Sequence, residues 1–167
     1  MKKVIVILFI IMLVVLLSKD TKVMIPKNSI RFRIIANSNL IKDQEQKQII
    51  KKDIETELYK ITNNATDINE TRALIQNNIP IIKEKINKYT NNYNLSFGMN
   101  YFPKKYYKGL TYEEGNYESL VITLGKGLGE NWWCVLFPPL CLLEVEEKNI
   151  NDVNYSFYIK EILNKYM

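Results

Sequence analysis

The first pattern along the chain is an uninterrupted apolar run. Fourteen apolar residues extend from Val4 to Leu17 and follow Lys2 and Lys3 directly. A basic start and an apolar run of this kind are typical of a secretory signal segment. Fourteen residues at helical rise span about 21 Å, which is short of the roughly 30 Å hydrocarbon core of a bilayer. The pattern therefore predicts an exported protein whose residues 1–18 form a signal peptide or a signal anchor.

The end of the apolar run does not decide whether the signal segment is cleaved. Only Ser18 is small there, and Leu16 stands two places before it, so the small residues expected at a cleavage site are missing. A cleaved signal fits, and so does an uncleaved anchor that holds the chain at the membrane. Residues 19–29, which include Pro26, are predicted to be a linker. Residues 30–167 are predicted to form a single extracytoplasmic domain.

Two strands and three helices are predicted in the first part of this domain. Apolar and polar residues alternate over 30–36, as in a strand with one buried face, and again over 95–101. Between these strands apolar residues recur at helical spacing, and Asp67 with Glu70 forms a capping-box-like start. Pro80 fits the first turn of a helix but not its interior. The predicted helices cover residues 43–62, 67–77 and 81–89.

The second part of the domain predicts further strands. Residues 102–116, rich in Tyr, Lys and Gly, are predicted to be an irregular loop. The apolar runs 118–124 and 132–137 flank a glycine-rich turn and predict a β-hairpin. The tail, residues 151–167, is predicted to be a helix. Together these elements predict an α+β fold, with a small, mostly antiparallel sheet covered on one face by helices and preceded by the signal segment.

Composition removes several classes of function. The chain contains no histidine, which excludes Ser-His-Asp and Cys-His nucleophilic catalysis and HExxH zinc proteolysis. Two cysteines cannot supply the four thiolates of a structural zinc site. Without Lys2 and Lys3, 21 basic and 18 acidic residues remain, and they are interspersed rather than gathered in a stripe. We therefore expect no metal, no cofactor and no nucleic acid as a partner.

Two sets of residues resemble catalytic motifs without meeting their requirements. The glycines of residues 125–129 lack the dinucleotide spacing, and no Gly-Lys-Ser/Thr follows, so a tight turn is favoured over a phosphate-binding loop. Glu113, Glu114 and Glu118 offer carboxylate pairs of the kind used in glycoside hydrolysis. Nothing in the sequence around them indicates the burial that raises a carboxyl pKa. A solvated face is favoured for these glutamates, and no catalytic residue is assigned.

The segment from Asn131 to Cys141 differs in kind from the rest of the chain. It combines two adjacent tryptophans, two prolines and two cysteines. Neighbouring strand residues point to opposite faces, so only one of Trp132 and Trp133 readily enters a one-sided core. The other indole is either covered by another element or exposed, and an exposed tryptophan beside a stiff apolar loop is typical of an interaction hot spot. The predicted partner-binding residues are Asn131, Trp132, Trp133, Phe137, Pro138, Pro139 and Leu140.

Cys134 and Cys141 are predicted to form a disulfide. Export would bring the chain into a compartment that permits disulfides, and the number of cysteines is even. The alternative is two buried free thiols.

Three stretches of the sequence carry a family resemblance. They are IRFRIIANS from Ile30, GNYE from Gly115 running into VITLG, and NWWCVLFPPLC from Asn131, of which the last is the most specific. Together they resemble the stage II sporulation protein R family of endospore-forming bacteria. The resemblance covers roughly Ile30 to Leu143 and leaves the linker and the tail outside it.

This resemblance implies a signal made in the forespore and exported into the space between forespore and mother cell. There it would act on a membrane-embedded aspartic protease of the mother cell, which then cleaves the precursor of the mother-cell sigma factor, sigma-E. The chain would be a ligand and activator rather than an enzyme. The competing class is an extracytoplasmic cell-wall-binding module or a carboxylate-dependent hydrolase, which a pocket with two converging carboxylates would favour.

Overall fold

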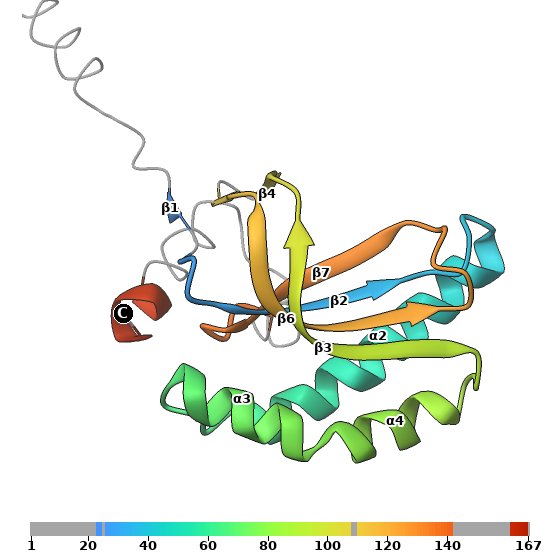
Figure 1. The fold of residues 1–167 in the computed structure, drawn as a ribbon, viewed down its shortest axis with the longest axis horizontal. Helices are drawn as coiled ribbons and strands as arrows, with labels where there is room; N and C mark the ends of the chain where they lie inside the picture. Colours follow the sequence, from blue (N-terminus) through green and yellow to red (C-terminus); the bar gives the residue numbers. More distant parts are fainter. Residues whose placement is uncertain (1–22, 25, 108–109, 142–160, 167) are drawn as a thin grey trace, which may run out of the picture.

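The computed structural model describes residues 23–24, 26–107, 110–141 and 161–166 (Figure 1). The predicted signal segment, residues 1–18, lies outside them. Among the described residues, no helix combines the length and the apolar composition needed to cross a membrane. The strands of the described residues form two sheets, one of four strands and one of three.

A mixed four-stranded sheet is the centre of the fold. Its strands in spatial order are β3 (Tyr93–Phe102), β6 (Gly115–Leu124), β2 (Ile30–Ile35) and β7 (Asn131–Phe137). β6 is antiparallel to β3 and parallel to β2, and β7 is antiparallel to β2. The fold is therefore α+β, as predicted. The sheet is mixed because its two central strands run parallel.

The predicted hairpin between 118–124 and 132–137 is wrong. β6 and β7 lie at these positions, but β2 runs between them, so that Phe32 pairs with Leu120 on one side and with Cys134 on the other. Turn chemistry favours pairing of strands that are neighbours in sequence, whereas here the first long strand of the chain separates them. β6 is buried on both faces over most of its length, as a central strand is.

Three helices cover one face of this sheet (Figure 1). They are α2 (Ile41–Thr62), α3 (Ile68–Asn77) and α4 (Ile79–Asn87). The Asp67 carboxylate caps α3, because it accepts hydrogen bonds from the backbone N–H groups of Asn69 and Glu70 at 2.7 and 2.9 Å. Pro80 lies in the first turn of α4, where its missing N–H is not needed. All three predicted helices are present, and their ends differ from the predicted ones by at most two residues.

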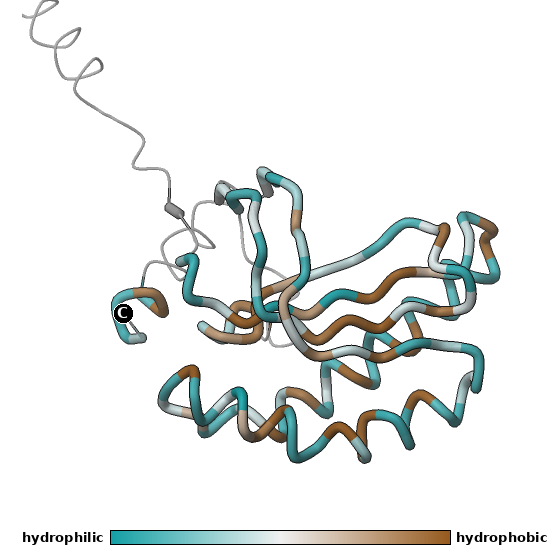
Figure 2. Tube along the Cα trace, in the orientation of Figure 1, coloured by the Kyte–Doolittle hydropathy of each residue, from teal (hydrophilic) through white to brown (hydrophobic). Residues whose placement is uncertain are grey.

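The main core lies between the helices and the sheet. Ile30, Phe32 and Ile34 project from β2 into it and are completely buried. The largest contributions of the helices and of β6 come from Ile50, Ile54, Leu58, Ile75, Ile82, Ile86, Leu120 and Ile122. Figure 2 shows the most apolar stretches on the central strands and, at intervals, on the helices beneath them. Full burial of one such side chain contributes about 1.5 to 3 kcal/mol, so this layer provides most of the driving force for folding.

The segment predicted as an irregular loop contains two short strands, so that prediction is wrong in part. β4 (Lys105–Tyr107) and β5 (Leu110–Tyr112) form an antiparallel pair. β5 also pairs in parallel with β1 (Val23–Met24), which lies within the predicted linker. Strands of two or three residues are too short for an alternating pattern to reveal them. The described part of the tail is a helix at residues 161–166, as predicted, and residues 151–160 lie outside the described chain.

Candidate functional site

The two tryptophans of β7 lie on opposite faces of the sheet, as their adjacency predicts. Trp132 is half-buried on the helical side, where its ring meets that of Phe32 at a centroid distance of 5.9 Å. Lys51 Nζ lies 3.9 Å from the centre of the same indole. Trp133 is only 9% exposed and meets the ring of Phe102 at 5.3 Å on the other side. One indole therefore remains partly accessible and the other belongs to the interior.

A second apolar cluster covers the face of the sheet opposite the helices. We call it the aromatic cluster, and its buried members are Phe102, Tyr112, Tyr117, Trp133, Val135, Leu140 and Leu163. Leu163 comes from the C-terminal helix, so the end of the chain packs on this face. Both faces of the sheet are therefore covered, at least over its central strands.

Arg31 is completely buried in the aromatic cluster. Its guanidinium carbon lies 3.3 Å from the centre of the Tyr117 ring, 4.9 Å from that of Phe102 and 5.0 Å from that of Trp133. None of its guanidinium nitrogens has a hydrogen-bond partner in the described parts of the chain. Burial lowers the pKa of Arg31 to about 10. The charge is therefore held by aromatic faces, an arrangement that suits the weakly hydrated guanidinium better than an ammonium group.

Arg33 lies on the same face of β2. Its guanidinium carbon is 3.8 Å from the centre of the Phe102 ring, and its Nη2 donates a hydrogen bond to the carbonyl of Tyr101 at 2.7 Å. Burial lowers the pKa of Arg33 as well. The alternation of apolar residues with Arg31 and Arg33 predicts a strand with one buried face, which is wrong, because β2 is buried on both. The sequence analysis assigns neither arginine to a site. The pattern that could have indicated their burial is arginine between apolar residues in a chain rich in tyrosine.

The chain folds back on itself after β7. The backbone N–H groups of Leu140 and Cys141 donate to the carbonyl of Val135 at 3.1 and 2.9 Å. A disulfide joins Cys134 and Cys141, whose Cα atoms are 5.3 Å apart. That the two cysteines are oxidised in the cell stays a prediction.

The predicted partner-binding residues divide into an accessible group and a buried group. Asn131 is exposed, and Trp132 and Pro139 are partly exposed. The remaining ones are buried: Phe137 belongs to the main core, Trp133 and Leu140 belong to the aromatic cluster, and Pro138 follows Phe137.

A polar network fastens the loop before α2 to the turn that precedes β7. Asn37 Nδ2 donates to Asp43 Oδ2 at 2.8 Å, and the Ser38 hydroxyl donates to the same oxygen. These hydrogen bonds lower the pKa of Asp43. Asn37 Oδ1 in turn accepts a hydrogen bond from the backbone N–H of Lys126 at 2.9 Å. The ends of β2 and β6 are thus held together by side chains.

The same network requires glycine in the turn. Gly125 has a φ of +53°, and a Cβ at this position would overlap with the side-chain amide of Asn37. A Cβ at Gly129 would overlap with the carbonyl of Ser38. The element that follows is the strand β7, not a helix. These glycines therefore allow two loops to approach closely. The predicted turn is present, but it does not join the two strands of a hairpin, because β2 lies between β6 and β7.

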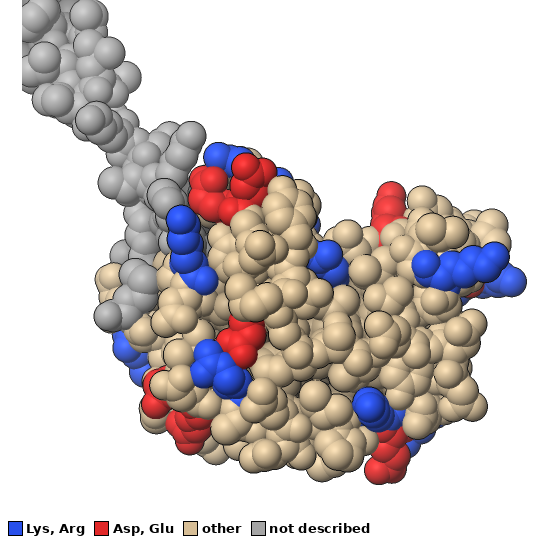
Figure 3. All heavy atoms as spheres, viewed as in Figure 1, with Lys and Arg blue, Asp and Glu red and all other residues tan. Residues whose placement is uncertain are grey.

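The three glutamates considered for hydrolysis each have a different partner. These are Arg72 for Glu118, at 2.6 and 2.8 Å, Lys104 for Glu113, at 3.1 Å, and the Tyr101 hydroxyl for Glu114, at 3.3 Å. Among the residues that the structure describes, no group of three or more Asp, Glu or Cys side chains is placed to hold a metal ion. Figure 3 shows basic and acidic side chains interspersed on the face that it draws.

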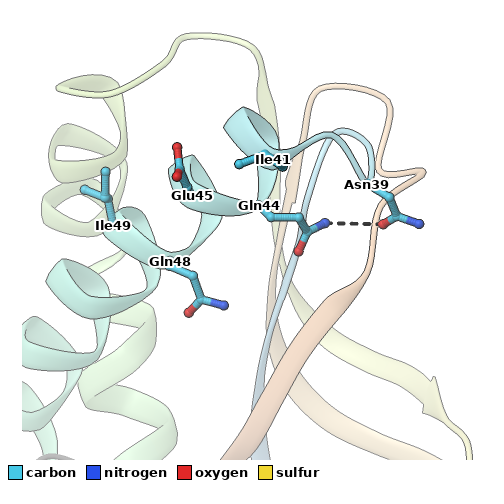
Figure 4. A pocket seen from close by; sticks show the side chains of 6 residues that line it. All are labelled: Asn39, Ile41, Gln44, Glu45, Gln48 and Ile49. Atoms are coloured by element: carbon cyan, nitrogen blue, oxygen red, sulfur yellow. Dashed lines mark hydrogen bonds between the residues drawn. The ribbon is translucent and has the colours of Figure 1, made fainter.

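A shallow groove of about 540 Å³ lies on the outer side of the start of α2 (Figure 4). It is lined by Asn39, Ile41, Gln44, Glu45, Gln48 and Ile49. In Figure 4, Gln44 points toward Asn39, to whose Oδ1 its amide donates at 3.3 Å. Lys47 on the same helix donates to Gln44 Oε1 and to the carbonyl of Glu130, directly before Asn131. The groove therefore adjoins the accessible start of β7.

Comparison with known proteins assigns a family to this small α+β domain with its disulfide-closed segment. The chain belongs to the stage II sporulation protein R family, whose sequence model matches residues 26–147. Stage II sporulation protein R of Bacillus subtilis (strain 168) is 41% identical to it over 133 residues, which are 76% of this chain and 59% of that protein. The chain thus spans less than two thirds of the length of this curated relative. No solved structure matches it significantly.

Proposed function

We propose that this protein is an exported signal of endospore formation that activates a membrane-embedded aspartic protease of the mother cell. The protease would then process the precursor of the mother-cell sigma factor, sigma-E. The observation that carries the proposal is membership of the stage II sporulation protein R family, with a match over residues 26–147. In this account the chain is a ligand made in the forespore, and the catalysis belongs to its partner.

Export is part of this proposal and has a simple test. The apolar run Val4 to Leu17 after two lysines is typical of a secretory signal, and the Cys134 to Cys141 disulfide suits an oxidising compartment. We expect residues 1–29 fused to a reporter to place it outside the cytoplasm. A reporter retained inside would contradict export.

We propose that the protease contacts the start of β7 together with the adjoining groove on α2. Asn131 is exposed, and Trp132 presents the accessible part of a rigid indole. Lys51 lies over that ring and Phe32 packs at its edge, so the indole is already held in one orientation. A preorganised aromatic side chain beside an apolar groove can bury a large area with a small loss of conformational entropy.

The buried members of the predicted contact have a supporting role in this proposal. Phe137, Pro138 and Leu140 hold the end of β7 and the disulfide-closed turn against the sheet. Their truncation would change signalling only through loss of the fold. Trp133, within the aromatic cluster, belongs with them.

Reconstitution tests the function directly. Membranes that contain the protease and its precursor substrate should cleave the precursor when this protein is added and remain inactive without it. If cleavage is independent of the protein and the purified chain binds cell-wall glycan, the cell-wall-binding alternative replaces the signalling role.

A further inference from the structure

The strand β3 forms an open edge of the four-stranded sheet. It is ten residues long, YNLSFGMNYF, and contains no charged residue and no proline. Among the strands that the structure describes, β3 pairs only with β6. Soluble proteins usually protect an edge strand of this length with charges, proline or a covering segment, because its free N–H and C=O groups can pair with another strand.

The opposite edge of the sheet is protected. On β7 the carbonyl of Val135 already accepts two backbone hydrogen bonds from the turn that the Cys134 to Cys141 disulfide closes. The strand also ends at Phe137, directly before Pro138. β3 differs further in that it presents two large apolar side chains to solvent, Met99 at 67% exposure and Tyr101 at 57%.

The sequence of β3 reads almost the same in both directions about Phe97. Tyr93 and Tyr101 are equidistant from it, and so are Asn94 and Asn100. The next two equidistant pairs are chemically similar, Leu95 with Met99 and Ser96 with Gly98. When two identical strands pair in antiparallel fashion about a two-fold axis, each residue faces the one at the same distance on the other side of the centre. Such a strand is complementary to itself.

We propose that two copies of this protein associate through β3, in antiparallel pairing centred on Phe97, to form one continuous eight-stranded sheet. On the helical side Phe97 would face Phe97, and Met99 of each copy would face Leu95 of the other. On the opposite side Asn94 would face Asn100. Each aromatic, aliphatic or amide residue would thus face a residue of the same chemical type, as in favourable cross-strand pairs. No like charges would face each other along the strand.

The tyrosine hydroxyls at the two ends of the proposed pairing already have partners within their own copy. The Tyr93 hydroxyl donates to the backbone carbonyl of Lys83, and the Tyr101 hydroxyl donates to the carboxylate of Glu114. In this register Tyr93 of one copy would face Tyr101 of the other. The association does not depend on the proposed signalling function.

A mixture of two cysteine variants tests the register. In the proposed pairing Ser96 of one copy faces Gly98 of the other, within reach of a disulfide. Ser96 is exposed, and a Cβ at Gly98 meets no atom within 4 Å, so both positions accept cysteine. We expect oxidation of mixed Ser96→Cys and Gly98→Cys proteins to give a 96–98 crosslink, identified by peptide mass spectrometry. Either variant alone should form none, because like positions lie diagonally across the axis.

Charge on the strand tests the association itself. Met99→Lys should shift the full chain from dimer to monomer in sedimentation velocity, because it places an ammonium group against Leu95 of the other copy. The matched control is Tyr106→Lys, which replaces an equally exposed apolar residue on β4 and should leave the dimer intact. The apolar run Val4 to Leu17 is common to both variants, so association through it would respond to neither. A wild-type monomer at every soluble concentration, or equal crosslinking in the single variants and the mixture, would overturn the proposal.

Discussion

The guanidinium carbon of Arg31 lies 3.3 Å from the centre of the Tyr117 ring, and no described carboxylate accompanies it. Burial lowers the pKa of Arg31 to about 10, so the surroundings of the guanidinium disfavour its charged form. Three aromatic rings within 5.0 Å offset this effect, each by up to about 2 kcal/mol when water is excluded. The aromatic faces therefore oppose the effect of burial, and the planar shape and weak hydration of the guanidinium suit it to this position.

Arg31→Met should therefore leave the free energy of unfolding within about 1.5 kcal/mol of wild type, because it removes the buried charge and keeps the length of the side chain. Arg31→Lys should cost at least about 2 kcal/mol, since a strongly hydrated ammonium cannot stack on the Tyr117 ring. Urea unfolding of both variants measures the difference. A methionine variant less stable than the lysine variant would show that the positive charge itself is required.

The Asp43 carboxylate should make the stability of the protein dependent on pH in acid. Its pKa is lowered in the folded state by hydrogen bonds from Ser38 and Asn37. A carboxyl group of this kind stabilises the fold above its ordinary pKa, which is near 3.8, and loses that contribution as the pH falls through the folded value.

The stability difference between wild type and Asp43→Asn should thus be constant near neutral pH and shrink as the pH falls below about 3.9. Unfolding midpoints in urea at a series of pH values measure it, with Asn69→Ala as a neutral-residue control outside the network. A difference that stays constant down to pH 2 would mean that the hydrogen bonds of Asp43 do not favour its charged form.

Gly125 and Gly98 form a matched pair for testing the turn. Gly125→Ala should lower the free energy of unfolding by about 1 to 3 kcal/mol, because the φ of +53° disfavours a side chain and the Cβ would overlap with Asn37. Gly98→Ala should change it little, since a Cβ there enters open space. Thermal unfolding of the two variants provides the comparison. Equal losses would show that the Asn37 contact does not restrict the turn.

The disulfide should contribute measurably to stability. Cys134 and Cys141 are separated by seven positions, and closing a loop of this size stabilises a fold by about 2 to 3 kcal/mol through the unfolded state. Cys134→Ser with Cys141→Ser should lower the free energy of unfolding by that amount. Intact mass after alkylation under non-reducing conditions identifies the redox state of the exported wild type, and two alkylated thiols would contradict the bond.

Local elements of the fold could be predicted from sequence because their signals are local. Asp67 and Pro80 mark the starts of α3 and α4, and the spacing of Ile50, Ile54 and Leu58 marks the buried side of α2. The arrangement of the strands could not be predicted in the same way. The pairing of β2 between β6 and β7 joins residues more than eighty positions apart, and no turn residue records it.

The surroundings of Arg31 and Arg33 could not be predicted from the sequence either. Arg31 and Arg33 alternate with apolar residues, which normally places arginine in solvent. They are buried because residues from distant segments, including Trp133 and Leu163, cover that face of the sheet. The adjacency of Trp132 and Trp133 did predict that the two indoles lie on opposite faces of the sheet, because alternation along a strand is a local property.

Alanine variants of the two tryptophans distinguish the proposed contact residue from the core residue. Trp133→Ala should lower the free energy of unfolding by about 3 to 5 kcal/mol, because it empties a buried site between Phe102 and Arg31. Trp132→Ala should cost less stability and at least about 2 kcal/mol of binding to the protease. Melting temperature and protease activation are measured side by side. Loss of activity only in proportion to lost stability in both variants would move the contact away from β7.

Cleavage of the sigma-E precursor in membranes that contain the protease is the most direct measurement of signalling by this protein. The rate is compared without this protein, with wild type and with Trp132→Ala. The signalling account predicts cleavage only with wild type, while Trp132→Ala melts as a folded protein and restores little of the rate. The same rate of cleavage with and without the wild-type protein would contradict the account.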